Sequence, residues 1–354
     1  MWRVLCVDDD QQKARDVGEY LSEWHKGNDF GEFHVTTESS FDKAVERIRT
    51  ERFDLVTLDL HGATDPPPEK DDGLHEQEGR RILDVIKSEC FLPVVFYTGF
   101  ADKIKGLESS VVRIVKKGDN DLESVRAAVG KIFSTGLPKL SAQILKDKRD
   151  FMWEVIDKQA DLVQESADLA YLLARRLAAR FSAVSVKEVL GDKVGSAKPI
   201  ELYIYPPVPD AIHTGCILKD DDGFWIVATP ACDFAQNRAD HVVLLSAVPI
   251  SEHPIYLKWM DSKSVKNTEA VRRLTVNNGG DRYRFLPGTF FIDDLVVDFQ
   301  GIKRVEMANF DVTKVVCRLD SPFREDLLGS FSRYYGRIGV PEIDITKSVA
   351  RIAL

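Results

Sequence analysis

Runs of apolar residues alternate with amphipathic stretches through the first 135 residues of the chain. Each of five short runs, rich in β-branched and apolar residues, is followed by a stretch with apolar residues at helical spacing. The predicted strands are 2–7, 32–36, 55–60, 94–98 and 111–115, and the predicted helices are 13–24, 41–49, 80–87, 103–108 and 122–133. Strands that are apolar at consecutive positions are typical of a parallel sheet covered by helices on both faces. We therefore expect an α/β domain with a doubly wound, five-stranded parallel sheet.

The next segment, residues 136–183, has a strongly helical pattern. Neither glycine nor proline occurs from Lys139 to Phe181, where Ala, Leu, Lys, Glu, Arg and Gln dominate. Apolar residues recur every three to four positions from Met152 to Leu177, which is compatible with a coiled-coil seam or a helical hairpin. We predict a long helical linker or dimerisation helix, and hence a homodimer. The alternative is a helix that packs on its own chain.

Helical periodicity fades in residues 184–354, where Gly, Pro, Asp and β-branched residues become frequent. Asp222-Gly223 lies between two apolar runs, which predicts a β-hairpin. One helix is expected at 325–335, and the candidate strands are 201–205, 215–219, 224–228, 241–247, 255–257, 281–285, 290–292, 295–300, 303–310 and 314–318. This pattern predicts a mostly antiparallel β domain of unknown type.

Composition excludes several classes of protein. A chain of 354 residues is long enough for two or three domains, and 44% hydrophobic with 30% charged residues excludes wholesale disorder and a fibrous architecture. No apolar run approaches about 18 residues and no signal-peptide pattern is present, so we expect a cytoplasmic protein without membrane contact. Five widely spaced cysteines without a CxxC pair argue for free thiols and against a disulfide framework.

The net charge of −9 argues against a chain that coats nucleic acid, but this charge is unevenly distributed. Residues 1–138 carry 27 acidic against 19 basic side chains, so nearly all of the excess is N-terminal. Some of these acids follow predicted strands: Asp8 and Asp9 follow the first, and Asp59 lies at the end of the third. Because the carboxyl ends of parallel strands meet at one edge of a sheet, we expect these three carboxylates to converge.

The same edge carries a hydroxyl, Thr98, at the end of the fourth strand and an ammonium, Lys116, after the fifth. Clustered carboxylates repel one another unless a cation neutralises them, and an oxygen-only ligand set fits Mg²⁺. The hydroxyl and the ammonium would hold phosphoryl oxygens. A carboxylate can attack phosphorus to form an acyl phosphate, and Asp59, on the central strand, is the expected nucleophile.

Four motifs, VLCVDDD, FDLVTLDLHG, VVFYTGF and RIVKKGD, follow one another within about residues 1–135. Together they make this segment similar to the receiver domain of two-component response regulators, which has a flavodoxin-like fold. The resemblance implies Asp59 as the phosphoacceptor and Mg²⁺ as the cofactor. The other implied residues are Asp8 and Asp9 as the acidic pair on Mg²⁺, the backbone carbonyl of His61 as a further ligand, Thr98 as the switch hydroxyl and Lys116 as the phosphate-binding lysine.

Three features depart from this family pattern. Arg113 takes the place of the usual aromatic residue three positions before the lysine, and Lys117 takes the place of the proline after it, so the expected cis peptide is in doubt. The acidic, proline-containing loop 61–78 is about a dozen residues longer than the family norm. Long loops beside a site are often lids or partner contacts, and a plain surface excursion is the alternative.

In residues 184–354 no motif identifies catalytic residues. Cys232-Asp233 is a candidate nucleophile pair and His213, Cys216, Cys232 and His241 are candidate zinc ligands, but neither set has motif spacing. A run of seven basic side chains lies between Lys258 and Arg284. Because residues 184–354 carry a charge of only −2, we favour a solvated face over a nucleic-acid surface for this basic run. This segment is predicted to be β-structured, without the paired short helices of a helix-turn-helix. The basic run comprises Lys258, Lys263, Lys266, Arg272, Arg273, Arg282 and Arg284.

We therefore predict a response regulator that a histidine kinase or phosphotransfer protein phosphorylates. The signal would pass through a helix to an output domain without a helix-turn-helix. No enzyme chemistry is expected beyond phosphoacceptance and self-dephosphorylation. Two alternatives stay open: a defence or stress effector whose C-terminal domain acts on nucleic acid, and a phosphate sink or adaptor without output chemistry.

Overall fold

The chain forms two compact units, residues 1–194 and residues 195–354, and each is described by itself. The computed structural model describes residues 1–24, 29–60, 78–118, 121–153, 157, 166–181, 183–191, 197–208, 212–277 and 282–337. Among these residues, no helix is both long enough and apolar enough to cross a membrane.

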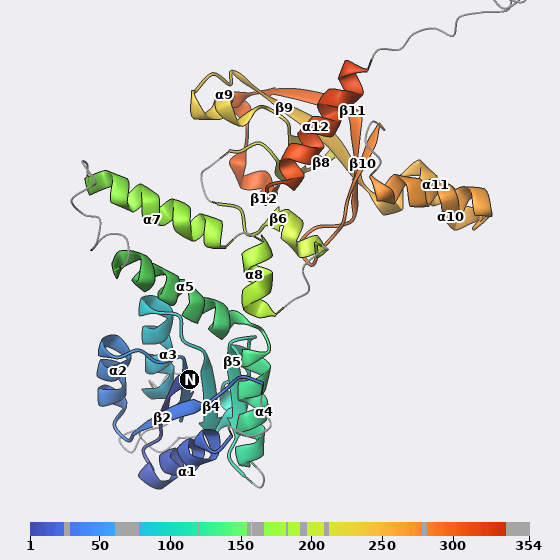
Figure 1. Cartoon of the computed structure of the whole chain (residues 1–354). Helices are drawn as coiled ribbons and strands as arrows, with labels where there is room; N and C mark the ends of the chain where they lie inside the picture. Colours follow the sequence, from blue (N-terminus) through green and yellow to red (C-terminus); the bar gives the residue numbers. More distant parts are fainter. Residues whose placement is uncertain are drawn as a thin grey trace, which may run out of the picture. The chain divides into compact units, whose positions relative to one another are not determined.

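A five-stranded parallel sheet forms the centre of the first unit (Figure 1). Its order is β2-β1-β3-β4-β5, which is the flavodoxin-like order and confirms the predicted fold. Because the chain direction across the sheet reverses at β1, the switch point lies between β1 and β3. The strands are β1 (Trp2–Val7), β2 (Phe33–Glu38), β3 (Leu55–Leu58), β4 (Val94–Thr98) and β5 (Val112–Lys116).

Helices cover both faces of this sheet. Alternate residues of the central strands point to opposite faces, so Val94 and Phe96 enter one core while Val95 and Tyr97 enter the other. The first core contains α2 (Phe41–Thr50) and α3 (Glu78–Glu89), and the second contains α1 (Gln11–Ser22) and α4 (Asp121–Phe133). The helix predicted at 103–108 is replaced by two short 3₁₀ turns, η1 (Ala101–Lys103) and η2 (Lys105–Leu107).

Among the described residues, the sheet is followed in the first unit by α5 (Leu137–Phe151), α7 (Ser166–Arg180) and α8 (Ala183–Leu190). Helix α5 contacts α4, α7 and α8. Arg180 Nε lies 3.1 Å from Asp147 Oδ2, and the Arg176 guanidinium lies 5.4 Å from the centre of the Phe151 ring. These two pairs join α7 to α5, so the two helices pack against each other and are not parts of one continuous rod.

The second unit contains a seven-stranded sheet of order β10-β11-β9-β8-β7-β12-β6 (Figure 1). Neighbouring strands pair antiparallel, as predicted for this domain. The predicted hairpin is confirmed at Asp222-Gly223, where Gly223 has a φ of 123°. Helix α12 (Phe323–Gly336) packs Leu327 and Tyr334 into the core of the sheet. The strands are β6 (Tyr203–Ile204), β7 (Cys216–Asp220), β8 (Gly223–Val227), β9 (His241–Pro249), β10 (Tyr283–Leu286), β11 (Leu295–Glu306) and β12 (Val315–Leu319).

The strands predicted at 295–300 and 303–310 are one strand, β11, interrupted by a bulge between Asp298 and Ile302. Gly301 lies within the bulge, where a Cβ atom would collide with the side chain of Ser246. The bulge therefore explains why the apolar pattern reads as two strands.

The prediction of a strand at 255–257 is wrong, because this segment belongs to α10 (Pro254–Asp261), which is followed by α11 (Val265–Val276). His253 Nδ1 accepts a hydrogen bond from Ile255 N over 3.3 Å, and Ser264 Oγ accepts one from Asn267 N over 3.3 Å. These caps start two helices despite the β-forming residues at the start of α10. The expectation that paired short helices are absent here is wrong as well.

We expect the core of the second unit to depend strongly on Phe299, which is fully buried and packs against Phe331 and Tyr334. Phe299→Ala should lower the free energy of unfolding of this unit by about 3–5 kcal/mol, because it removes buried surface and leaves a cavity. Urea unfolding followed by circular dichroism measures the change. The matched control, Phe290→Ala, removes a ring that is 83% exposed and should cost less than about 1 kcal/mol. Equal losses in both variants would contradict this core.

Candidate functional site

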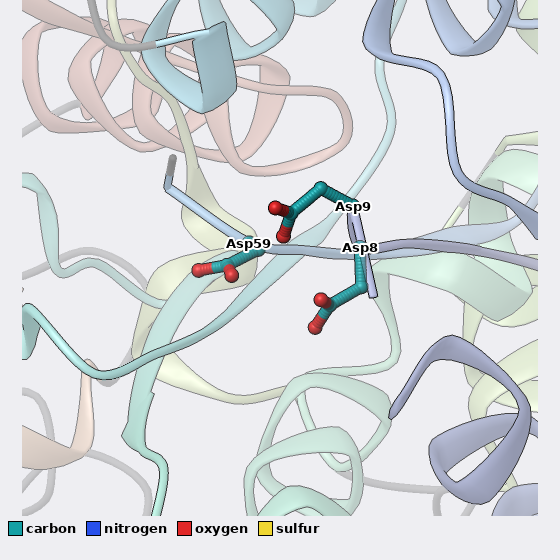
Figure 2. Close-up of side chains that lie close together, drawn as sticks. All are labelled: Asp8, Asp9 and Asp59. Atoms are coloured by element: carbon teal, nitrogen blue, oxygen red, sulfur yellow. The ribbon is translucent and has the colours of Figure 1, made fainter. Parts of the chain in front are cut away.

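Three carboxylates meet at the carboxyl edge of the parallel sheet. Because β1 and β3 are neighbours, with Val7 opposite Leu58, Asp8 and Asp59 leave the sheet side by side. Asp8, Asp9 and Asp59 each offer an oxygen within 4.8 Å of the others, and Figure 2 shows these side chains clustered. Asp8 and Asp59 are buried, whereas Asp9 is exposed. Within the described part of the chain, no other group of three such side chains lies this close together.

Backbone hydrogen bonds hold the Asp59 carboxylate in place. Asp59 N donates to Val7 O over 2.9 Å, and Leu60 N donates to Asp59 Oδ1 over 2.6 Å. The neighbouring carboxylate is fixed in a similar way, since Asp10 N donates to Asp8 Oδ1 over 3.1 Å. The carboxylates therefore stand on the rigid ends of strands, as a preorganised binding site requires.

Helix α3 approaches this edge closely at Gly79. Gly79 N donates to Leu60 O over 3.0 Å. A Cβ atom at Gly79 would lie 2.9 Å from Leu60 Cα and would collide with the carbonyl oxygen of Asp59. Only glycine lets the helix begin against the backbone of the site, a requirement that the sequence pattern did not reveal.

Lys117 connects two of the carboxylates. Its Nζ lies 2.7 Å from Asp8 Oδ2 and 2.7 Å from Asp59 Oδ2, and its side chain is 15% exposed. Burial opposes the charge of this ammonium, but the hydrogen bonds and charges of Asp59 and Asp8 outweigh burial and raise the pKa of Lys117. Burial raises the pKa of the Asp8 carboxyl, which the hydrogen bond from Lys117 opposes. The ammonium is thus the cation that allows buried carboxylates to lie together.

Tyr97 supports the ammonium from the neighbouring strand. Lys117 Nζ lies 5.2 Å from the centre of the Tyr97 ring, and the Tyr97 hydroxyl donates to Asp121 Oδ2 over 2.6 Å. The hydrogen bond fixes the ring at the start of α4, where it can attract the cation. This second supporting residue was also not predicted from the sequence.

The structure brings Lys117, and not Lys116, to the carboxylates. Lys116 is 65% exposed, and its Nζ lies 3.8 Å from Asp102 Oδ2. The alternation of side chains along β5 explains the difference: Ile114 enters the core with α2 and α3, whereas Val115 enters the core with α1 and α4. Lys117 comes two residues after Val115, so its side chain points to the same face of the sheet. Asp8 comes two residues after Cys6, which follows Val4 in the same alternation, so Asp8 points to this face as well.

Thr98 is fully buried at the end of β4, and its Oγ1 accepts a hydrogen bond from Phe100 N over 3.2 Å. The backbone of the same residue holds the lysine segment, since Lys117 N donates to Thr98 O over 3.0 Å. His61, the predicted carbonyl ligand, lies outside the described residues. The rest of the predicted loop lies outside them as well, except its last residue, Glu78, where α3 begins.

Two departures from the receiver pattern involve other residues when the positions are counted from Lys117 instead of Lys116. The residue three positions before it is Ile114, which packs against the core on the α2 side and is again not aromatic. The residue after it is Gly118 in place of proline. Among the described residues the cis peptide bonds are Tyr205-Pro206 and Ser321-Pro322, so the peptides on both sides of Lys117 are trans.

The candidate catalytic and zinc residues of the second unit do not gather into a site. Cys232 is exposed in the short helix α9 (Ala231–Ala235), and its Sγ lies 3.8 Å from Asp233 Oδ1. Cys216 is buried, and its Sγ accepts from His213 N over 3.4 Å. In the described part of the chain these residues form no metal-ligating group with His241.

More than half of the basic run forms ion pairs with carboxylates. Arg272 and Arg273 pair with Glu269 over 2.8 Å and 3.2 Å. The other ion pairs of the run among the described residues are Arg282 with Asp298 and Arg284 with Asp326. Four of the seven basic side chains therefore already have an acidic partner, which disfavours a continuous nucleic-acid surface.

No family model matches the sequence, and no curated protein matches it. Solved structures similar to the N-terminal part of the chain include response regulator receiver domains. The response regulator protein TrrA from Thermotoga maritima, described in complex with Mg²⁺-BeF, is 20% identical over 37% of this chain and 99% of that chain, with a TM-score of 0.29.

Two further solved structures show the same likeness. The receiver domain of Francisella response regulator 1452 is 20% identical over 38% of this chain and 99% of that chain, with a TM-score of 0.29. A CheY-like receiver domain from Methanospirillum hungatei is 18% identical over 37% of this chain and 94% of that chain, with a TM-score of 0.27. The likeness concerns the fold of the first unit.

We expect Gly79→Ala to disturb the carboxylate site because the added methyl group cannot fit beside Asp59 and Leu60. The first unit should lose about 1–3 kcal/mol of unfolding free energy, as is typical of overpacking. Gly106→Ala is the matched control, since no atom lies within 4 Å of a Cβ built there. Urea unfolding of both variants measures the difference. Equal stability of Gly79→Ala and the unsubstituted chain would show that the contact is not tight.

The two adjacent lysines should differ in their effect on stability. Lys117→Ala leaves Asp8 and Asp59 without their cation and should cost about 1–3 kcal/mol of unfolding free energy. Lys116→Ala removes an exposed side chain and should cost less than about 0.5 kcal/mol. Unfolding in metal-free buffer measures both values, and a larger loss for Lys116→Ala would reverse the assignment.

The same lysine predicts a pH dependence of stability. The pKa of Lys117 is raised above its ordinary value of 10.5, so its contribution is fully present below that pH. The contribution is lost as the pH rises through the higher pKa of the folded state. Unfolding measured from neutral to strongly alkaline pH should show this decline in the unsubstituted chain and less of it in Lys117→Ala. Parallel curves for the two proteins would contradict the ion pairing.

Proposed function

We propose that the chain is a response regulator in which Asp59 accepts a phosphoryl group from a histidine kinase or phosphotransfer protein. The observation that carries this proposal is the buried Asp59 carboxylate beside Asp8 and Asp9, with the Lys117 ammonium 2.7 Å away. A nucleophilic carboxylate, a place for a divalent cation and a cation for phosphoryl oxygens are the parts that acyl phosphate formation needs.

The donor set fits Mg²⁺. Asp8, Asp9 and Asp59 offer oxygen ligands only, and their number leaves positions for water and for a phosphoryl oxygen. When bound, Mg²⁺ would neutralise charge on the transferring phosphoryl group. The backbone carbonyl of His61 stays a proposed further ligand. We assign the phosphate-binding role to Lys117 in place of Lys116, because the Lys117 ammonium already lies on Asp59.

The proposed transfer is a displacement at phosphorus. An oxygen of Asp59 attacks the phosphorus of a phosphohistidine, an O–P bond forms, and the P–N bond breaks as the imidazole leaves and takes up a proton. Lys117 and the hydroxyl of Thr98 then hold phosphoryl oxygens. Self-dephosphorylation follows when water attacks the phosphorus, which releases inorganic phosphate and restores the Asp59 carboxylate.

Phosphorylation would change the ion pairs and hydrogen bonds of Lys117. In the unphosphorylated site its ammonium is shared between Asp8 and Asp59, and its backbone is tied to Thr98. A phosphoryl group on Asp59 adds negative charge on one side of this ammonium, so the end of β5 and the start of α4 are the segments that respond. We propose that the response passes through α5 and α7 to the second unit.

A homodimer through α7 is part of this proposal. Tyr171 is 71% exposed and Leu172 is 49% exposed, and none of the α7 residues whose burial is described is buried. A helix rich in leucine and alanine that buries so little on its own chain is a suitable surface for a second copy.

A phosphate sink or adaptor would use the same Asp59 chemistry without a response in the second unit.

Asp59→Asn tests the proposal directly. With Mg²⁺ and acetyl phosphate, the unsubstituted chain should gain one phosphoryl group by intact-protein mass spectrometry, and Asp59→Asn should gain none because an amide cannot replace the nucleophilic carboxylate. Asp42→Asn, which changes an acidic side chain that is 82% exposed, is the matched control and should be labelled normally. Labelling of Asp59→Asn at the unsubstituted level would overturn the assignment.

Hydrogen exchange of the labelled protein separates the regulator from the sink. Changed protection in α5, α7 and the second unit after labelling is expected for a response regulator. Changes confined to the edge of the parallel sheet would favour a phosphate sink or adaptor.

A further inference from the structure

The second unit contains a pocket that the Asp59 chemistry does not use. Helices α10 and α11, together with Arg282 and Tyr283, border an open pocket of about 530 Å³. This volume is in the range of about 300–1,000 Å³ that is typical of small-molecule sites. The lining residues are Ile255, Lys266, Glu269, Ala270, Arg273, Leu274, Arg282 and Tyr283.

The wall of the pocket is apolar and mostly aliphatic. Ile255, Ala270 and Leu274 line it from the two helices, and Leu274 is only 6% exposed. Tyr283 is the aromatic residue among the lining side chains, and its ring packs edge-on against the buried His253 at 4.8 Å. The Arg282 guanidinium lies 5.0 Å from the centre of the Tyr283 ring. A ligand therefore meets mainly aliphatic surface here and no pair of open aromatic faces.

Three cationic side chains contribute charge to the pocket: Lys266, Arg273 and Arg282. Arg282 donates from Nε to Asp298 Oδ1 over 2.7 Å and from Nη2 to Asp298 Oδ2, while its Nη1 has no partner among the described residues. Lys266 is exposed and forms no ion pair within the described part of the chain. Donors for an anion are thus present beside an apolar wall.

One carboxylate, Glu269, also lines the pocket, and two arginines donate hydrogen bonds to this carboxylate. Glu269 accepts from Arg272 Nε over 2.8 Å and from Arg273 Nε over 3.2 Å. These hydrogen bonds lower the pKa of Glu269 to about 2, so it stays a paired carboxylate at neutral pH. Glu269 pairs with Arg273 and Asp298 pairs with Arg282, so Lys266 is the cationic lining residue that has no carboxylate partner among the described residues.

We propose that this pocket binds an aliphatic carboxylate of medium chain length. The alkyl chain would lie along Ile255, Ala270 and Leu274, and the carboxylate would accept hydrogen bonds from Lys266 and from Nη1 of Arg282. A nucleotide fits less well, because its base would find no open pair of aromatic faces for stacking. The pocket is separate in sequence from Asp59, so this ligand site does not depend on the proposed phosphorylation.

Isothermal titration calorimetry of the full chain tests the ligand class with octanoate, hexanoate and 1-octanol as probes. Octanoate should bind one site roughly tenfold more tightly than hexanoate, because two more methylene groups are buried. Octanoate should also bind at least roughly tenfold more tightly than 1-octanol, which has no charge for the cations. Equal affinity of octanoate and 1-octanol, or tighter binding of adenosine monophosphate than of octanoate, would overturn the proposal.

Two variants place the binding in the pocket. Lys266→Glu should weaken octanoate binding roughly tenfold through loss of a charge-assisted contact, and Ala270→Phe should abolish it by filling the space. Lys258→Glu makes the same charge change on α10 outside the pocket and should leave affinity within about twofold. Unchanged melting temperatures confirm folding of each variant. Binding that survives both Lys266→Glu and Ala270→Phe would contradict the site, whereas Asp59→Asn should bind octanoate normally whichever way its labelling turns out.

Discussion

Electrostatic repulsion among three carboxylates is the constraint on which the first unit depends. Asp8 and Asp59 are buried side by side at the switch point of the sheet, and Asp9 lies within 4.8 Å of both. Such a cluster is stable only with a cation, and Lys117 supplies one at 2.7 Å from both buried groups. The two carboxylates and the nearby ring of Tyr97 keep this ammonium in place.

This constraint connects the fold with the proposed chemistry. The flavodoxin-like strand order places β1 beside β3, which brings the carboxylates together, and Gly79 lets α3 begin against the backbone of Asp59. Lys117 N also donates to Thr98 O, so the ammonium and the buried hydroxyl belong to one hydrogen-bonded edge. Added charge on Asp59 would therefore act on β4, β5 and the start of α4 together.

Much of this could be predicted from the sequence. Consecutive apolar positions gave the parallel sheet, and acids at strand ends gave Asp8, Asp9 and Asp59. The choice between Lys116 and Lys117 depends on which of the two cores Ile114 and Val115 enter. A sequence motif gives the order of these residues but not the core that each side chain enters. The β-forming residues of α10 predict a strand, but its capping residues outweigh them and start a helix. The pocket beside it brings together side chains from two helices and a strand, so no local pattern could reveal it.

The most direct measurement locates the phosphoryl group in the chain. Borohydride reduces an acyl phosphate of aspartate to homoserine, so phosphorylated protein treated in this way and digested can be read by peptide sequencing in a mass spectrometer. The account predicts homoserine at position 59, with Asp8 and Asp9 unchanged. Reduction at position 8 or 9, or at no aspartate of a chain that carries phosphate, would contradict it.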